Sequence, residues 1–121
     1  MQDTLRILVI PTSAAPFIEM IPVDTFAEAV HALIRGPIEA IELLADVQLL
    51  AHQQRTEYGL ALNSNVRTRS IRGTLVIIQH DHLSEPISLT DECLQAAMHV
   101  LGATIERPNS TFTFPKRIWD Y

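Results

Sequence analysis

Thr74-Leu75-Val76-Ile77-Ile78 is the most informative segment of this 121-residue sequence. Each of its residues is β-branched or aliphatic, so apolar side chains project from both faces of the extended chain. A strand with one solvated face would instead alternate apolar and polar residues. We therefore predict that residues 74–78 form the central strand of a sheet that is covered on each side.

Toward the N-terminus, the sequence predicts a β-hairpin. Residues 5–10 form an apolar run, rich in β-branched residues, that stops at Pro11. Residues 17–21 alternate imperfectly around Glu19 and stop at Pro22. The simplest arrangement is a second strand antiparallel to the first.

A helix should follow the hairpin. Asp24 or Thr25 can cap its N-terminus, and Thr25 with Glu28 has the spacing of a capping box. Gly36 and Pro37 should end the helix, because glycine tolerates the left-handed conformation and proline cannot continue the turn. Its apolar face consists of Phe26, Val30, Leu33 and Ile34.

The following apolar runs predict further strands. We expect two paired strands at residues 38–44 and 47–52 and a further short strand at residues 58–62. Asn63-Ser64-Asn65 has strong turn chemistry. Residues 80–86, after the central strand, should form a polar loop.

A second helix is predicted at residues 91–101. Ser88 or Thr90 can cap its N-terminus, and Gly102 can close its C-terminus. Its apolar face consists of Leu94, Ala97, Met98 and Leu101.

These elements, in the order ββαβββα, predict an α+β fold with a mixed, mainly antiparallel sheet of about five strands and two helices. Residues 1–103 should form a single domain, and residues 104–121 a tail that packs on this domain or on a second subunit. In the second case the protein would be a homodimer or a higher homo-oligomer. Four of the seven aromatic residues lie in the tail and are the predicted interface residues: Phe112, Phe114, Trp119 and Tyr121.

The composition predicts a cytoplasmic globular protein. A formal net charge of -5 opposes binding to phosphate backbones, so we do not expect a nucleic-acid partner. The single cysteine cannot form an internal disulfide, and no secretory signal pattern opens the chain. No apolar run approaches the roughly 18 residues that cross a bilayer, so no membrane partner is expected.

The sequence predicts neither catalytic residues nor a metal or cofactor. His80 and His82 flank Asp81 in the predicted loop, but no third ligand is fixed, so we favour a solvated loop over a metal site. Cys93 lies in the first turn of the second helix beside two acids, where a buried small side chain is favoured over a nucleophile. The common hydrolase, phosphate-loop and zinc-protease motifs are missing. We therefore do not expect an enzyme.

An arginine-rich segment is the best candidate for a binding site. Residues 55–72 contain four of the nine basic residues, and no acid occurs between Tyr58 and Gln79. Arginine suits phosphate and carboxylate groups, and the Asn63-Ser64-Asn65 turn offers further donors. The alternative is a surface loop whose arginines form weak salt bridges with acids elsewhere. The predicted ligand-binding residues are Asn63, Asn65, Arg67, Arg69 and Arg72.

Several motifs occur in a characteristic order: Gly36-Pro37-Ile38-Glu39, Leu62-Asn63-Ser64-Asn65-Val66-Arg67-Thr68, Ile71-Arg72-Gly73 and Ser88-Leu89-Thr90-Asp91-Glu92. In this order the chain resembles domain of unknown function 3846 over about residues 5–101. It departs from the family pattern at Asn63, usually a proline, and at Ala61, usually a glycine. The resemblance implies a protein of phages, plasmids or bacteria, and it implies no catalytic residues.

We therefore expect a small non-enzymatic binding protein of phage or mobile-element type, located in the host cytoplasm if phage-encoded. Its expected ligand is an anionic, nucleotide-like small molecule that it captures as a counter-defence factor. The alternative is an interaction module or inhibitor that acts on a host protein through its aromatic tail or acidic surface.

Overall fold

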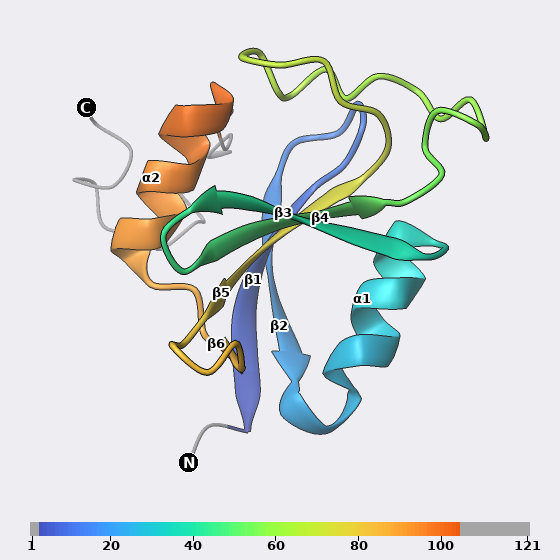
Figure 1. Ribbon diagram of the computed structural model, residues 1–121. Coiled ribbons are helices and arrows are strands. Elements are labelled where there is room, and N and C mark those ends of the chain that lie inside the picture. Colours follow the sequence, from blue (N-terminus) through green and yellow to red (C-terminus); the bar gives the residue numbers. More distant parts are fainter. Residues whose placement is uncertain (1–2, 105–121) are drawn as a thin grey trace.

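In the computed structural model, which describes residues 3–104, a six-stranded antiparallel sheet lies between two α-helices (Figure 1). The order across the sheet is β2-β1-β5-β4-β3, and β6 pairs with β5 outside this path. This arrangement confirms the predicted α+β class. The elements are β1 (Thr4–Ile10), β2 (Phe17–Pro22), η1 (Val23–Thr25), α1 (Phe26–Ile34), β3 (Ile38–Leu44), β4 (Val47–His52), β5 (Leu75–His80), β6 (Pro86–Ile87) and α2 (Asp91–Leu101).

The predicted central strand is central. β5 pairs antiparallel with β1 on one side and with β4 on the other. Leu75 and Ile77 belong to the cluster under α2, whereas Val76 and Ile78 belong to the cluster under α1. Because successive side chains of a strand point to opposite faces, each helix covers one face of the sheet.

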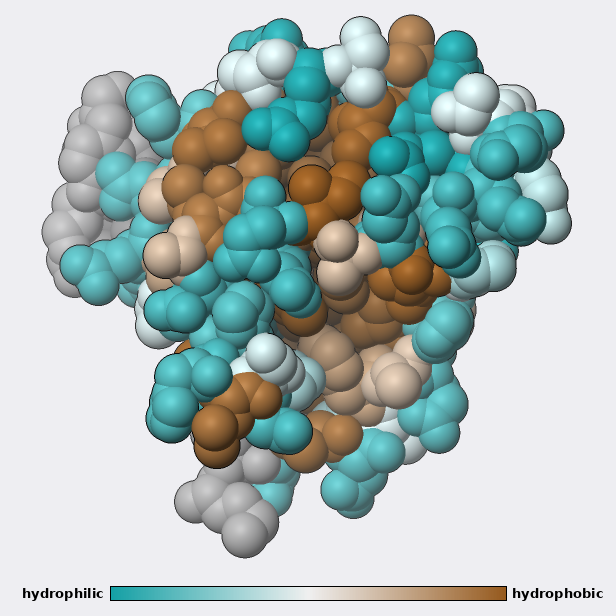
Figure 2. Space-filling model, viewed as in Figure 1, coloured by the Kyte–Doolittle hydropathy of each residue, from teal (hydrophilic) through white to brown (hydrophobic). Residues whose placement is uncertain are grey.

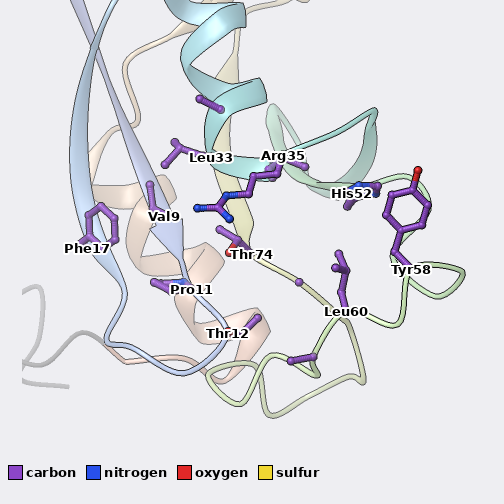
Figure 3. A pocket seen from close by; sticks show the side chains of 14 residues that line it. Val9, Pro11, Thr12, Phe17, Leu33, Arg35, His52, Tyr58, Leu60 and Thr74 are labelled. Atoms are coloured by element: carbon purple, nitrogen blue, oxygen red, sulfur yellow. The ribbon is translucent and has the colours of Figure 1, made fainter.

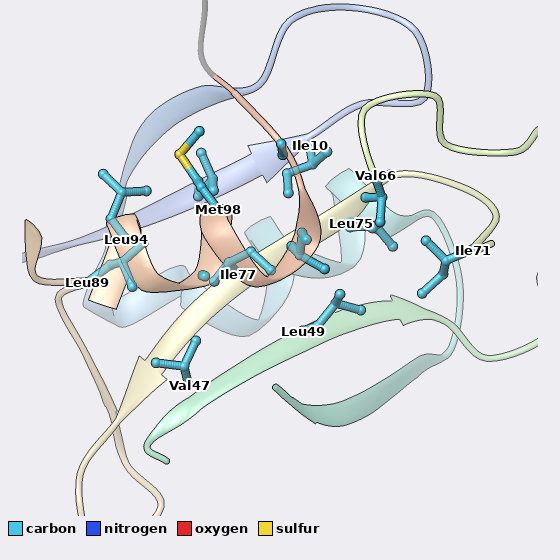
Figure 4. Packing of buried hydrophobic residues seen from close by; sticks show 14 of the residues in the cluster. Ile10, Val47, Leu49, Val66, Ile71, Leu75, Ile77, Leu89, Leu94 and Met98 are labelled. Atoms are coloured by element: carbon cyan, nitrogen blue, oxygen red, sulfur yellow. The ribbon is translucent and has the colours of Figure 1, made fainter. Parts of the chain in front are cut away.

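The cluster under α2 holds the sheet and the following loops together (Figure 4). Leu94 and Met98 of α2 pack with Ile10 of β1, Leu49 of β4 and Val66 of the 61–74 segment. Each fully buried side chain of this size contributes about 1.5–3 kcal/mol relative to an exposed one. Ile71 of the same segment also belongs to this cluster, so the 61–74 segment is fixed to the core at two residues, Val66 and Ile71.

Helix α1 packs the predicted face on the sheet, but it begins differently. Val30 and Ile34 are buried in the cluster under α1, and Phe26 is partly buried against it. Thr25 makes no side-chain capping hydrogen bond, so the predicted capping box is wrong. The short helix η1 leads directly into α1 instead, with the N–H of Phe26 donating to the Val23 carbonyl.

Helix α2 has the predicted caps. The side chain of Thr90 accepts a hydrogen bond from the Cys93 N–H at 3.2 Å, and Gly102 adopts the left-handed conformation at φ 67°. Ser88, the alternative cap, instead accepts a hydrogen bond from the Arg6 N–H at 2.8 Å.

Two sequence predictions about strands are wrong. Residues 58–62 form no strand, because residues 53–59 make successive turns and only Leu62 forms an isolated bridge, to Arg72. The sequence predicts a loop at residues 80–86. Its last residue, Pro86, instead begins the short strand β6 and pairs with His80 of β5. In residues 3–104 no helix is long and apolar enough to cross a membrane.

The edge strand β3 carries apolar side chains that the rest of the protein covers only in part. Ile41, Leu43 and Leu44 of the edge strand β3 are only partly buried. Figure 2 shows hydrophobic residues across the middle of the view, where β3 and β4 lie in Figure 1, within a hydrophilic surround.

Candidate ligand-binding site

A cleft of about 500 Å³ lies at one end of the sheet. At this end β1 and β4 finish, β2 and β5 begin, and α1 reaches its C-terminus. The remaining wall comes from residues 58–61, which follow β4 (Figure 3). None of the residues in 3–104 that line the cleft is acidic. The cleft is therefore apolar over much of its surface and has no carboxylate in its lining.

Arg35 is the only lysine or arginine that lines this cleft within the described part of the chain. It follows the last residue of α1 in the left-handed conformation (φ 69°, ψ 41°), and its N–H donates to the His31 carbonyl at 2.7 Å. Its guanidinium points into the cleft (Figure 3). No ion pair or hydrogen bond joins this guanidinium to any residue in 3–104.

The sequence predicts the left-handed turn at Gly36, but the turn falls on Arg35. Gly36 has another role, since a Cβ atom built at this position would lie 2.8 Å from Cδ2 of His52. The His52 ring is buried, and its Nδ1 accepts a hydrogen bond from the Gln54 N–H at 3.0 Å. Position 36 therefore requires glycine, because the His52 ring leaves no room for a Cβ atom. The strained left-handed conformation is adopted by the preceding residue, Arg35.

Two aromatic side chains lie at opposite sides of the cleft, with Arg35 between them in Figure 3. Phe17 begins β2 and is 37% exposed, and Tyr58 is 63% exposed. The Tyr58 ring is 5.1 Å from that of His52, at an interplanar angle of 55°. The Tyr58 ring therefore contacts the His52 ring, but most of the Tyr58 side chain is exposed to solvent.

Asn63 and Asn65, two predicted ligand-binding residues, hold the cleft together. Nδ2 of Asn63 donates to the carbonyls of Ile10 and Gly73, both at 2.9 Å, and its Oδ1 accepts from the Asn65 N–H. Nδ2 of Asn65 donates to the Pro11 carbonyl at 2.8 Å and to that of Ala14 at 2.7 Å. Both side-chain N–H groups of each amide therefore already donate to a carbonyl.

The three predicted arginines do not form one site. Arg72 donates to the Leu60 carbonyl at 2.8 Å, beside the cleft. Arg67 and Arg69 are exposed, and neither side chain pairs with a residue in 3–104. Arg67 lines a second, smaller hollow of about 230 Å³ together with residues 13–16, Asn65 and Thr104. Ligand binding by these residues remains a prediction.

The other candidate groups are separate from the cleft. Two backbone N–H groups, those of Glu85 and Leu83, donate to the Asp81 carboxylate and lower its pKa. Nδ1 of His80 lies 2.9 Å from the Asp81 carbonyl. In residues 3–104 no group of three histidine, cysteine or acidic side chains is arranged to hold a metal ion. The predicted interface residues Phe112, Phe114, Trp119 and Tyr121 lie outside the described residues.

A family model described as a domain of unknown function, DUF3846, matches residues 5–102. The chain belongs to this family. The match confirms the resemblance found in the sequence motifs. Two of these motifs, at residues 36–39 and 62–68, lie beside the cleft or hold its walls together. Neither a curated protein nor a solved structure matches the chain.

Sequence reasoning missed the cleft residues Phe17, Arg35, His52 and Tyr58 as a group. They come from four separate elements, so no local spacing joins them. One local signal was present: an arginine directly before Gly36-Pro37, at the end of a predicted helix, occupies a position that can turn left-handed.

Proposed function

We propose that this protein binds a small anionic ligand with a flat apolar group in the cleft around Arg35. The observation that carries the proposal is the unpaired guanidinium in a cleft without a carboxylate, flanked by two exposed aromatic rings. A guanidinium donates parallel hydrogen bonds to phosphate and carboxylate oxygens, and aromatic rings bind flat apolar groups.

The size and rigidity of the cleft support this proposal. A volume of about 500 Å³ is within the usual range for small-molecule sites. The hydrogen bonds of Asn63 connect the end of β1 to Gly73, just before β5. The hydrogen bonds of Asn65 connect the 61–74 segment to the β1–β2 loop. A cleft whose walls are joined by these hydrogen bonds needs little ordering when the ligand enters.

The charge distribution also favours an anion at this position. The protein is acidic overall, with a formal net charge of -5, but no acid occurs between Tyr58 and Gln79. Arg55, the nearest basic residue in the sequence before Tyr58, is already paired with Glu39 at 2.7 Å. Arg35 therefore supplies the positive charge that a bound anion would meet.

The proposed role is capture of the ligand without reaction. A protein that holds a nucleotide-like signal removes it from solution, which is how a counter-defence factor of a mobile element would act. In this proposal the expected class of ligand is unchanged, but the cleft around Arg35 replaces the arginine-rich segment as its main site.

Titration calorimetry with AMP, and with adenosine as the uncharged counterpart, tests the proposal. Arg35→Gln should weaken AMP binding at least tenfold, because it removes the charge but keeps a non-glycine residue at the left-handed position. Arg69→Gln is the matched control, since Arg69 is exposed, unpaired within the described chain and outside the cleft. Arg67→Gln tests the second hollow.

Two results would overturn the proposal. One is equal AMP affinity of the wild type and Arg35→Gln. The other is a loss of binding in Arg67→Gln alone, which would place the anion in the hollow beside Thr104.

A protein partner is the second candidate function, and the edge strand β2 favours it. Phe17 and Met20 of this strand are 37% and 53% exposed, and the outer edge of β2 has no neighbouring strand within residues 3–104. An open edge with apolar side chains can add a strand from another protein. Met20→Lys should abolish such binding and leave AMP affinity unchanged.

A further inference from the structure

The cleft places its binding groups in a sequence of ring, cation and ring. In Figure 3 the Phe17 side chain lies at one side, the Tyr58 side chain at the other, and the Arg35 guanidinium between them. The two rings come from different elements: Phe17 from the start of β2, and Tyr58 from the turns after β4. A ligand that uses all three groups must have a flat group at each end and an anionic group in the middle.

Both rings have exposed surface on which a flat group can stack. Phe17 is 37% exposed and Tyr58 is 63% exposed. Stacking of a nucleobase on an aromatic side chain tolerates any base and strengthens binding by about tenfold or more.

The number of charges in the cleft limits the anionic group. Within residues 3–104, Arg35 is the only lysine or arginine among the residues that line it. A phosphodiester carries one negative charge and offers two free oxygens, which a single guanidinium fork matches. A terminal phosphate carries between one and two charges near neutral pH. A triphosphate would carry still more charge into a protein of formal net charge -5.

We infer that the ligand is a dinucleotide, with one base on Phe17, the other on Tyr58 and the phosphodiester on Arg35. This inference rests on the proposed function, because it assigns the ligand of the same cleft. It extends that function in two ways. Each ring stacks on one base, and a ligand with two bases should therefore bind more tightly than a ligand with one.

Titration calorimetry with the linear dinucleotide ApA, AMP, adenosine and ATP tests the inference. ApA should bind at least tenfold more tightly than AMP, because AMP reaches only one ring. ATP should bind more weakly than ApA, because its additional phosphates have no cation in the cleft.

Variants of the two rings sharpen this test. Phe17→Leu and Tyr58→Leu each keep an apolar side chain but remove the stacking surface, and each should weaken ApA binding about tenfold. For AMP, one of the two variants should have no effect. Leu83→Ala is the control, because Leu83 is 69% exposed and outside the cleft. Circular dichroism confirms that each variant is folded.

Ionic strength separates a dinucleotide from a longer strand. ApA carries a single charge and has no condensed counterion atmosphere, so its affinity should fall only weakly with added salt, whereas a longer strand releases counterions and should show a steeper fall. Tighter binding of a hexanucleotide than of ApA, with a steeper slope, would identify a single-stranded nucleic acid and overturn the inference.

Equal affinities for ApA and AMP would also overturn the inference, and so would Phe17→Leu or Tyr58→Leu with unchanged ApA affinity. The proposed function would survive these results if Arg35→Gln still weakened AMP binding. If neither ApA nor AMP bound, or if Arg35→Gln bound both as well as the wild type, the proposed function and the inference would fail together.

Discussion

Helices α1 and α2 end in the same backbone conformation but with different residues. After α1, Arg35 has φ 69° and ψ 41°, and after α2, Gly102 has φ 67° and ψ 33°. Glycine reaches this conformation without strain, whereas an L-residue with a side chain is strained by about 1–2 kcal/mol. The end of α2 is thus unstrained, whereas the end of α1 is strained at a residue whose side chain lines the cleft.

The surroundings of the two ends explain this difference. A Cβ on Gly102 would lie 3.1 Å from Cγ2 of Thr68 and 3.2 Å from Cβ of Arg67, so only glycine fits well there. At the end of α1 the position without room for a Cβ is Gly36, one residue beyond the turn, because the His52 ring lies against it. The left-handed position itself is open, and Arg35 extends from it into the cleft.

Gly36→Ala should have the largest effect on stability. The new methyl group would overlap the His52 ring, which is buried and hydrogen-bonded to the Gln54 N–H, so neither group can move freely. Overpacking of this kind costs about 2–3 kcal/mol. Urea denaturation should show a lower midpoint with an unchanged slope. In a double-mutant cycle, Gly36→Ala should cost less in the His52→Ala background than in the wild type, and an equal cost in the two backgrounds would show that the strain has another origin.

Gly102→Ala should destabilise the protein by about 1–2 kcal/mol, because the left-handed conformation and the contact with Thr68 both oppose a Cβ. AMP binding to the folded protein should not change, since Gly102 lies outside the cleft. Urea denaturation measures the loss of stability. Titration calorimetry with AMP, under conditions in which the variant is folded, measures the affinity. A change in AMP affinity would mean that the two helix ends are coupled.

The sequence predicts the central strand and α2 better than the end of α1 and the cleft. Apolar periodicity over residues 74–78 and 91–101 is local, so it identifies the central strand and α2 directly. The left-handed turn falls on Arg35, and Gly36 is instead needed for the His52 ring, which packs against it from 16 residues away in the sequence. Local rules therefore assign that turn to the glycine.

The predicted roles of Asn63 and Asn65 have the same limitation. Their amides are good donors, and the sequence suggests an anion as acceptor. In the fold they meet backbone carbonyls of residues 10, 11, 14 and 73. Those carbonyls lie at the end of β1, in the β1–β2 loop and before β5, and only the sheet order brings them to the asparagines.

The beginnings of the two helices provide a smaller contrast. Thr90→Ala should cost about 1 kcal/mol, because the Thr90 side chain accepts the Cys93 N–H. Thr25→Ala should cost clearly less, since Thr25 makes no capping hydrogen bond. Thermal denaturation of the two variants side by side measures the difference. Equal losses would indicate that Thr25 does cap α1 in solution.

Arg35→Gly should have the smallest effect on stability, in the opposite direction. Glycine relieves the left-handed strain at φ 69°, but it also makes the unfolded chain more flexible, so the net gain should be about 0.5 kcal/mol. The same variant should lose AMP binding as Arg35→Gln does, because both lack the guanidinium. Denaturation and calorimetry on Arg35→Gly and Arg35→Gln then separate strain from charge: only the glycine variant should gain stability, and both should lose binding. If Arg35→Gly were destabilised by more than the roughly 1 kcal/mol that the flexibility of the unfolded chain explains, Arg35 would contribute to the fold itself, and its position would need no ligand to explain it.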